Sequence, residues 1–317
     1  MRSLLAVIGR KAPLVLVGGV VLGLVLPGLG NVIGWSIPLL VIMLLAVAMA
    51  RVDFAQVLTH LRRPLRLGFV LLILMAGFPL AAHALAGWFG LSPILHLAVV
   101  LVACGPPLAS SPSMAVLLKL DDALVLNVMV VGTLIVPLSA PTLAVSVLDI
   151  PVDLEVGPLL LRLALTIGLA LAAAIVIRRV MGRDRIEKQG DVLDGISALM
   201  MVIFAVVVMN GIGLTGMQDP WQVLYVLAVV FLANWGLHAL TGAGLIVFRA
   251  VRKNDEALLS PQSGAIALIA GNRNMALFLA ALPADTAEAL FLFIALYQLP
   301  IYLTPIMAAP IYRRLLR

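Results

Sequence analysis

The stretch "IALIAGNRNMALFLAAL", residues 266 to 282, places Asn272, Arg273 and Asn274 in the middle of an otherwise apolar run. The rest of the chain is similarly apolar, because 63% of its 317 residues are hydrophobic and only 11% are charged. A soluble domain of this size could not cover such a composition with polar surface. We therefore expect an all-α membrane protein, in which a charge inside a span needs a specific reason.

Ten runs are long enough to cross about 30 Å of hydrocarbon as helices. They lack the alternation of a membrane strand, so ten transmembrane helices are expected rather than a barrel. The first run is expected to be a retained span, because it is long for a signal peptide and no small-residue cleavage site follows it. The predicted spans are 12–29, 33–50, 67–88, 93–118, 123–147, 158–177, 193–214, 221–248, 260–283 and 286–312.

The positions of Lys and Arg orient these spans. Basic residues precede the first span and follow the second, fourth, sixth, eighth and tenth, and of the 21 basic residues only Arg162 and Arg273 depart from this pattern. The positive-inside rule then predicts a multi-pass protein of the cell (inner) membrane with both termini cytoplasmic. The net charge of +6 is explained by these loops and the lipid bilayer, and no nucleic-acid partner is expected. Arg162 lies near a span end, where its side chain can snorkel, whereas Arg273 has no such route.

An internal repeat links the two halves of the chain. The motif "SPSMAVLL" at residues 111–118 is matched by "NRNMALFL" at 272–279, 161 residues later. By the charge pattern the fourth and ninth spans run in opposite directions, so we predict two inverted five-helix repeats, residues 1–147 and 158–312. Inverted repeats with discontinuous helices at matching positions are typical of secondary transporters, whose substrate site lies where the breaks meet near the midplane.

The breaks supply a candidate site. Pro106, Pro107 and Pro112 remove backbone donors, so the fourth helix is predicted to unwind between Gly105 and Ser113. Opened helix ends expose amides and carbonyls that need partners, and they favour an anion. The alternative is that the polar residues only pack on a kinked helix. The candidate substrate-binding residues are Ser110, Ser111, Ser113, Asn272, Arg273 and Asn274.

Arg273 is the most informative of these residues. Arginine stays protonated, and an unpaired charge at that depth costs at least about 2.5 to 3.5 kcal/mol, so a counter-ion is expected. Our hypothesis is that a small organic anion supplies it, since a planar guanidinium beside two amides suits a carboxylate, sulfonate or phosphate. The alternative is that Arg273 bonds the free carbonyls of the broken fourth helix and only holds the crossing together.

Together these motifs resemble the bile acid:sodium symporter family, including bacterial homologues of the apical sodium-dependent bile acid transporters. The resemblance is most specific over "ASSPSMAVLLKLDDALVLNVMVVGTLIVPLSAPTLA", residues 109–144, and "GNRNMALFLAAL", residues 271–282. It implies that helices four and nine unwind and cross. It also implies a core domain of helices 3–5 and 8–10 that works against a panel domain of helices 1–2 and 6–7.

The resemblance further implies a cation site with Na⁺ as coupling ion, whose ligands fall on Ser111, Thr133 and Asn274. The chain departs from the family pattern where the sodium-binding glutamate becomes Ile269, an asparagine becomes Pro112 and a glutamine becomes Arg273. No Asp or Glu lies in the middle of a predicted span, so Arg273 is expected to hold, as a fixed charge, the place of a bound cation. Sodium coupling, proton coupling and uncoupled transport all stay open. His83, His96 and His238 are the ordinary proton carriers within spans, or they are packing residues.

The expected function is secondary active transport of a bile acid-like or smaller carboxylate by alternating access. An intramembrane enzyme or a channel using the same polar cluster is the alternative. The chain has no H-E-x-x-H, no membrane aspartate pair and no G-x-S-x-G turn, so an enzyme is not expected. One arginine is not a ring around a pore. Cys104 is the single cysteine, and no Cys/His spacing indicates a metal site, so no cofactor other than Na⁺ is expected.

Overall fold

The structure, a computed structural model, describes residues 2–52, 57, 64–147, 154–251 and 260–316. In these ranges the regular structure is helical, apart from one isolated antiparallel bridge between Pro107 and Arg273. Six helices in the described ranges are long and apolar enough to cross a membrane, as expected of an all-α membrane protein, and they fall on six of the predicted spans: Leu65–Trp88, Asp122–Val145, Val156–Met181, Gly190–Met209, Pro220–Val247 and Ala284–Leu315. The other four predicted spans are shorter or interrupted, so ten crossings and the inversion of the repeats stay predictions.

The chain forms two compact units, and each unit takes segments from both halves of the sequence. Unit 1 comprises Met1–Val52, Leu161–Val226 and Ala276–Ala295. Unit 2 comprises Asp53–Leu160, Leu227–Met275 and Leu296–Arg317. The expected assignment to core and panel domains stays a prediction.

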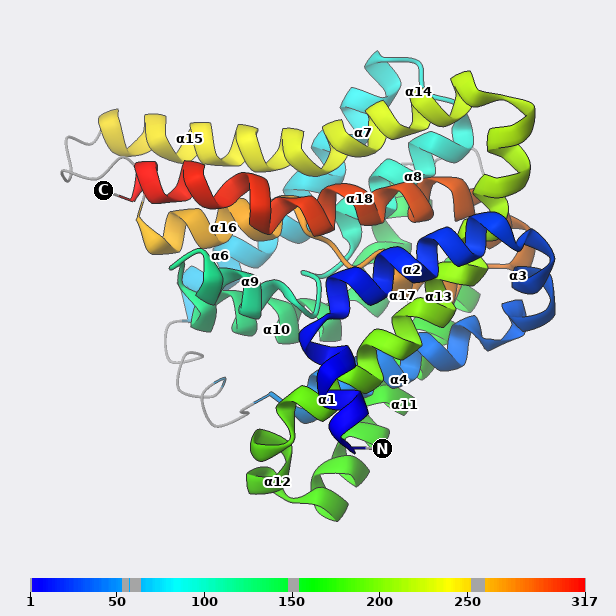
Figure 1. Ribbon diagram of the computed structural model, residues 1–317. Coiled ribbons are helices and arrows are strands. Elements are labelled where there is room, and N and C mark those ends of the chain that lie inside the picture. Colours follow the sequence, from blue (N-terminus) through cyan, green and yellow to red (C-terminus); the bar gives the residue numbers. More distant parts are fainter. Residues whose placement is uncertain (1, 53–56, 58–63, 148–153, 252–259, 317) are drawn as a thin grey trace. The chain divides into compact units, whose positions relative to one another are not determined.

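In unit 1, α1 (Arg2–Arg10) and α2 (Ala12–Val25) pack along α13 (Gly190–Gln218) (Figure 1). The approach is so close that a Cβ on Gly195 would lie 2.0 Å from the carbonyl oxygen of Leu5. The first predicted span is interrupted at Leu26, where Pro27 begins a second helix. The other helices with residues in unit 1 are α3 (Pro27–Ile33), the 3₁₀ turn η1 (Gly34–Ser36), α4 (Ile37–Ala50), α11 (Val156–Met181), α12 (Arg183–Lys188), α17 (Ala276–Leu279), and the first parts of α14 and α18.

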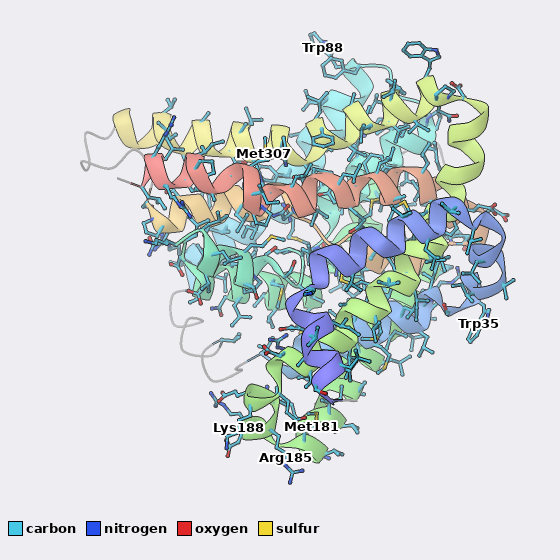
Figure 2. The ribbon with its side chains drawn as sticks, in the orientation of Figure 1. Trp35, Trp88, Met181, Arg185, Lys188 and Met307 are labelled. Carbon is cyan, nitrogen blue, oxygen red and sulfur yellow. The ribbon has the colours of Figure 1, made fainter. Side chains whose placement is uncertain are left out.

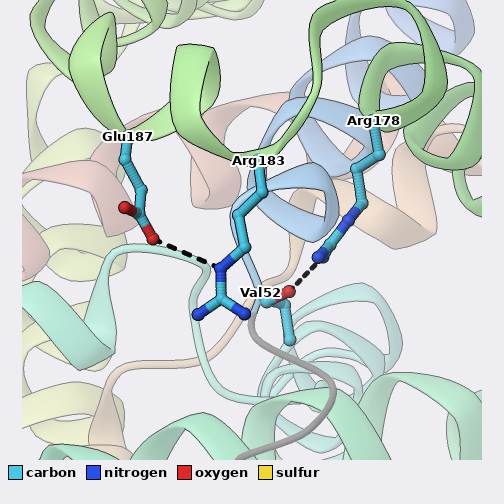
Figure 3. Close-up of polar contacts among 4 residues, drawn as sticks. All are labelled: Val52, Arg178, Arg183 and Glu187. Carbon is cyan, nitrogen blue, oxygen red and sulfur yellow. Dashed lines mark hydrogen bonds and ion pairs between the residues drawn. The ribbon is translucent and has the colours of Figure 1, made fainter.

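One end of unit 1 is polar and carries loops predicted to be cytoplasmic. A guanidinium nitrogen of Arg178 donates to the carbonyl oxygen of Val52, and Arg183 Nε pairs with Glu187 at 3.4 Å along one exposed helix face (Figure 3). Arg51 also pairs with Asp194. Beneath these contacts Val47, Ile186 and Leu193 form an apolar cluster, so the α11–α12–α13 connection is tied to the end of α4.

Unit 2 repeats one order of elements. A helix containing a π-turn is followed by a broken helix and then by a helix with internal prolines. The first series is α6 (Pro64–Leu72), η2 (Ile73–Gly77) and α7 (Phe78–Trp88), then α8 (Pro93–Cys104) and α9 (Ser111–Leu117), then α10 (Asp122–Pro141) and η3 (Thr142–Val147). The second series, which unit 2 holds in part, is α14 (Pro220–Phe231), η4 (Leu232–Gly236) and α15 (Leu237–Val251), then α16 (Pro261–Gly271) and α17, then α18 (Ala284–Leu315).

Side-chain caps begin two of these helices. The Asp121 carboxylate accepts from Leu124 N at 2.9 Å at the start of α10, and the Ser260 hydroxyl accepts from Ser263 N at 3.1 Å at the start of α16. These bonds satisfy amides that a helix start leaves without a partner.

Candidate functional site

Two interruptions of helical structure define the candidate site. The first is residues 105–110, between the end of α8 at Cys104 and the start of α9 at Ser111. The second is residues 272–275, between the end of α16 at Gly271 and the start of α17 at Ala276. The first break was predicted, and it contains Pro106 and Pro107, whereas Pro112 lies in the first turn of α9, where proline is tolerated.

The two broken segments pair with each other through their backbones. Leu108 N donates to Asn272 O at 3.0 Å, and Asn274 N donates to Pro106 O at 2.8 Å, on either side of the bridge between Pro107 and Arg273. We call this paired region, residues 105–110 with 272–275, the crossing. The pairing satisfies part of the backbone that the breaks release, as an apolar environment requires.

Arg273 lies at the centre of the crossing and is fully buried, with 0% of its surface exposed. Its Nε donates to Ala270 O at 3.0 Å, one terminal nitrogen donates to Gly105 O at 2.9 Å, and the other donates to Leu74 O at 3.0 Å. The three acceptors lie at the end of α16, just beyond the end of α8 and in the π-turn η2. The guanidinium therefore joins three segments through neutral carbonyl dipoles.

The remaining contacts of the guanidinium are apolar or weakly polar. Met75 Sδ lies 3.9 Å from a terminal nitrogen, and the Phe78 ring centroid lies 5.8 Å from the guanidinium carbon, within cation–π range. No Asp or Glu is among the buried residues of the described ranges. The alternative that the sequence left open, in which Arg273 bonds carbonyls of the broken fourth helix, is matched by Gly105 O alone, because Ala270 O and Leu74 O belong to other segments.

A second polar group closes the end of α16. Gly271 O accepts from Asn234 Nδ2 at 2.9 Å and from the Tyr297 hydroxyl. Asn234 Nδ2 also lies 3.2 Å from Asn272 Oδ1, and His238 Nε2 bonds Leu268 O at 2.6 Å. His238 is thus bonded to the last turn of α16.

Asn234 and Tyr297 were not among the predicted site residues. A signal for Asn234 was present, because "FLANWGLHAL" at 231–240 places it four residues before His238, on the same helix face of an apolar run. Tyr297 gave no comparable signal, since tyrosine is common in membrane helices.

Gly271 is required by this packing. A Cβ at position 271 would lie 2.2 Å from the backbone oxygen of Asn234 and 2.5 Å from His238 Cδ2. Both distances are much shorter than van der Waals contact. With any residue other than glycine at position 271, the end of α16 could not lie close enough to η4 and α15 for Asn234 and His238 to bond its carbonyls.

The helix geometry separates the predicted serines. Ser111 is fully buried, and its hydroxyl oxygen has no hydrogen-bond partner among the described residues. Ser110 and Ser113 are exposed, and Asn274 is half-buried. In and next to the crossing, two hydroxyls are therefore exposed and one amide is partly accessible, whereas the guanidinium is buried.

The predicted cation ligands are Ser111, Thr133 and Asn274, and the hydroxyl of Thr133 is already bonded within its own helix. Thr133 is buried and its hydroxyl donates to Met129 O at 2.7 Å within its own helix. Its helix, α10, packs against α9, which carries Ser111. The described residues contain no group of three or more His, Cys, Asp or Glu side chains that could hold a metal ion. A cation about 6 Å from Arg273 would be repelled by about 3 kcal/mol at an effective dielectric constant of ~20.

Arg162, the other arginine within a predicted span, provides a contrast. Its side chain is exposed, and the contact from one of its terminal nitrogens to Ala281 O is long at 3.5 Å. Burial inside a carbonyl shell therefore distinguishes Arg273 from an arginine at a span end.

A scan against models of known protein families found no match to this chain, and a search of curated proteins found no match either.

Proposed function

We propose that this protein is a secondary transporter that moves a small organic anion across the cell membrane by alternating access. The observation that carries the proposal is the crossing, in which two broken helices pair around one buried arginine. Broken helices at membrane depth are tolerated where they are buried in protein or line a water-filled cavity, and paired breaks at matching positions are a feature of transporters built from repeats. The repeated order of a π-turn helix, a broken helix and a proline-containing helix supports the same proposal.

The charge of the crossing favours an anion as substrate. The three carbonyls around Arg273 are neutral, so they solvate its charge without cancelling it. In the proposal the hydroxyls of Ser110 and Ser113 and the amide of Asn274 donate to the anion. An anion held at about 8 Å from the guanidinium would gain about 2 kcal/mol of Coulomb energy at an effective dielectric constant of ~20. In this proposal Arg273 attracts the substrate electrostatically from within the crossing.

The guanidinium also bears on ion coupling. In the proposal it replaces the bound cation that the resemblance to the bile acid:sodium symporter family implies, because it fills the crossing with a permanent positive charge held by oxygen ligands. Transport is then expected not to require sodium. A bile acid-like or smaller carboxylate stays the proposed substrate class.

The test is the thermal stability of the purified protein with a panel of short 2-oxo acids, aromatic carboxylates and a steroid carboxylate. Each compound is tested in sodium chloride and in potassium chloride at equal ionic strength. A ligand at about 100 times its dissociation constant should stabilise the protein by about 2.7 kcal/mol, equally in both salts. Stabilisation in sodium alone would contradict the proposed role of Arg273, and no stabilisation by any member would contradict the substrate class.

The control variant is Arg162→Gln, which removes an exposed arginine from a different unit. It should keep the anion response, whereas Arg273→Gln should lose it. If Arg273→Gln does not fold, Arg273→Lys is measured instead. It retains the positive charge, so it should keep the anion response.

A further inference from the structure

Two histidines of unit 2 face each other at a distance from the crossing. His83 Nδ1 and His96 Nε2 are 2.9 Å apart, and the ring centroids are 4.7 Å apart at an interplanar angle of 49°. His83 lies in α7 and His96 in α8, and both side chains are half-buried. The short 89–92 connection between these helices, in which Gly90 takes a positive φ of 60°, brings the two rings together.

The pair lies near one end of the α7–α8 hairpin. Trp88 is the last residue of α7 and is 87% exposed, with its ring pointing away from the helix (Figure 2). Phe89 beside it is also exposed. Exposed tryptophans are enriched where a membrane meets water. His83 lies five positions before Trp88, about 7.5 Å along the helix, so the pair is close to this end of α7.

The elements that pack most extensively against α7 and α8, besides the two helices themselves, are η2, η3 and α10, and they carry few titratable side chains. η2 and η3 carry no titratable side chain. In α10 the titratable residue is Asp122, at its first position, and in α8 it is Cys104, about 12 Å along the helix from His96. The two imidazoles are thus each other's nearest titratable groups in these elements.

The chemistry of the contact limits how many protons the pair can hold. A hydrogen bond between two imidazoles needs an N–H on one ring and a lone pair on the other. When both rings are neutral, the donor ring still has a free nitrogen, and a proton from water can bind there without breaking a bond. The contact then becomes a charge-assisted N⁺–H···N bond. A second proton would remove the accepting lone pair and would place two positive charges side by side.

We propose that His83 and His96 together form a binding site for one proton, supplied from water at the Trp88 end of unit 2. The two rings share that one proton through the Nδ1···Nε2 contact instead of binding one proton each. This inference rests on the pair alone and does not depend on the proposed transport. If transport occurs, the site gives unit 2 a proton-binding group outside the crossing.

Nitrogen-15 NMR of the histidine rings tests the proposal directly. The chain has four histidines, so a protein labelled only at histidine gives a simple spectrum that single variants can assign. In His83→Gln and in His96→Gln we expect the remaining imidazole to bind a proton of its own as the pH is lowered, because the second ring no longer competes for it. In the unsubstituted protein the pair should gain one proton over the same pH range while the N–H···N bond is kept.

The matched control is His238→Gln, which removes a histidine bonded to a backbone carbonyl elsewhere in unit 2. It should leave the titration of the pair unchanged. In the unsubstituted protein, His96 could reach full protonation at the same pH as in His83→Gln, and His83 at the same pH as in His96→Gln. That result would overturn the proposal. Should the variants fail to fold, scalar coupling across N–H···N in the unsubstituted protein decides, because its absence at all pH values would also overturn the proposal.

Discussion

Replacing Arg273 by glutamine should destabilise the crossing strongly. The three carbonyls that lose a donor are Ala270 O, Gly105 O and Leu74 O, all within 3.0 Å of guanidinium nitrogens in the structure. Each buried carbonyl left without a partner costs about 1 to 2 kcal/mol, which gives about 3 to 6 kcal/mol for three. The glutamine amide can restore one bond, so the expected net loss is about 2 to 4 kcal/mol.

The assay for this variant is thermal unfolding in detergent at fixed salt. With about 2 to 4 °C lost per kcal/mol, the midpoint should fall by about 4 to 16 °C. Arg273→Lys should lie between the unsubstituted protein and Arg273→Gln, because an ammonium keeps the charge but cannot reach three carbonyls in one plane. An unchanged midpoint in Arg273→Gln would refute the reasoning, since the crossing would then not depend on the guanidinium for its hydrogen bonds.

Three further substitutions, the first with a matched control, test the packing around the crossing and away from it. Gly271→Ala should lower the free energy of unfolding by about 3 kcal/mol or more, because the added Cβ would lie 2.2 Å from the backbone oxygen of Asn234. The control is Gly242→Ala, whose Cβ would lie 3.9 Å from Ala267 Cβ, and it should be neutral or stabilising in the same thermal unfolding experiment. Asn234→Ala should lower the free energy of unfolding, measured by chemical denaturation, by about 1 to 3 kcal/mol, because Asn272 Oδ1 and Gly271 O each lose a donor. A loss below about 0.5 kcal/mol would count against these two hydrogen bonds. Arg183→Ala removes an exposed pair with Glu187 and should change stability by no more than about 0.5 kcal/mol, so a larger effect would show that this helix does more than lie at the surface.

Local sequence patterns were sufficient to place most helices and the first break. Apolar runs and prolines act within a few residues, so the unwinding after Cys104 and the interruption at Gly271 could be inferred from the chain alone. The interruption between α16 and α17 contains no proline, and it was inferred from its polar residues and from its match to the motif at 111–118.

The contacts of Arg273 could not be predicted in the same way. Leu74 O is 199 positions away along the chain, and it accepts from Arg273 where the π-turn η2 interrupts regular helix. Backbone carbonyls have no sequence signature, so the residue types favoured a substrate counter-ion and gave no indication of which carbonyls would surround Arg273. The three serines were grouped for the same reason. Only the helical rotation of α9 shows that Ser111 points inward while Ser110 and Ser113 are exposed.

The most direct test of the proposed function is uptake by proteoliposomes of the carboxylate that stabilises the purified protein most. Uptake is measured with sodium and with potassium as the only external cation, for the unsubstituted protein, Arg162→Gln and Arg273→Gln. The account predicts equal uptake in both salts for the unsubstituted protein and for Arg162→Gln, and loss of uptake in Arg273→Gln. Uptake that requires sodium, or that survives Arg273→Gln at the unsubstituted rate, would contradict it.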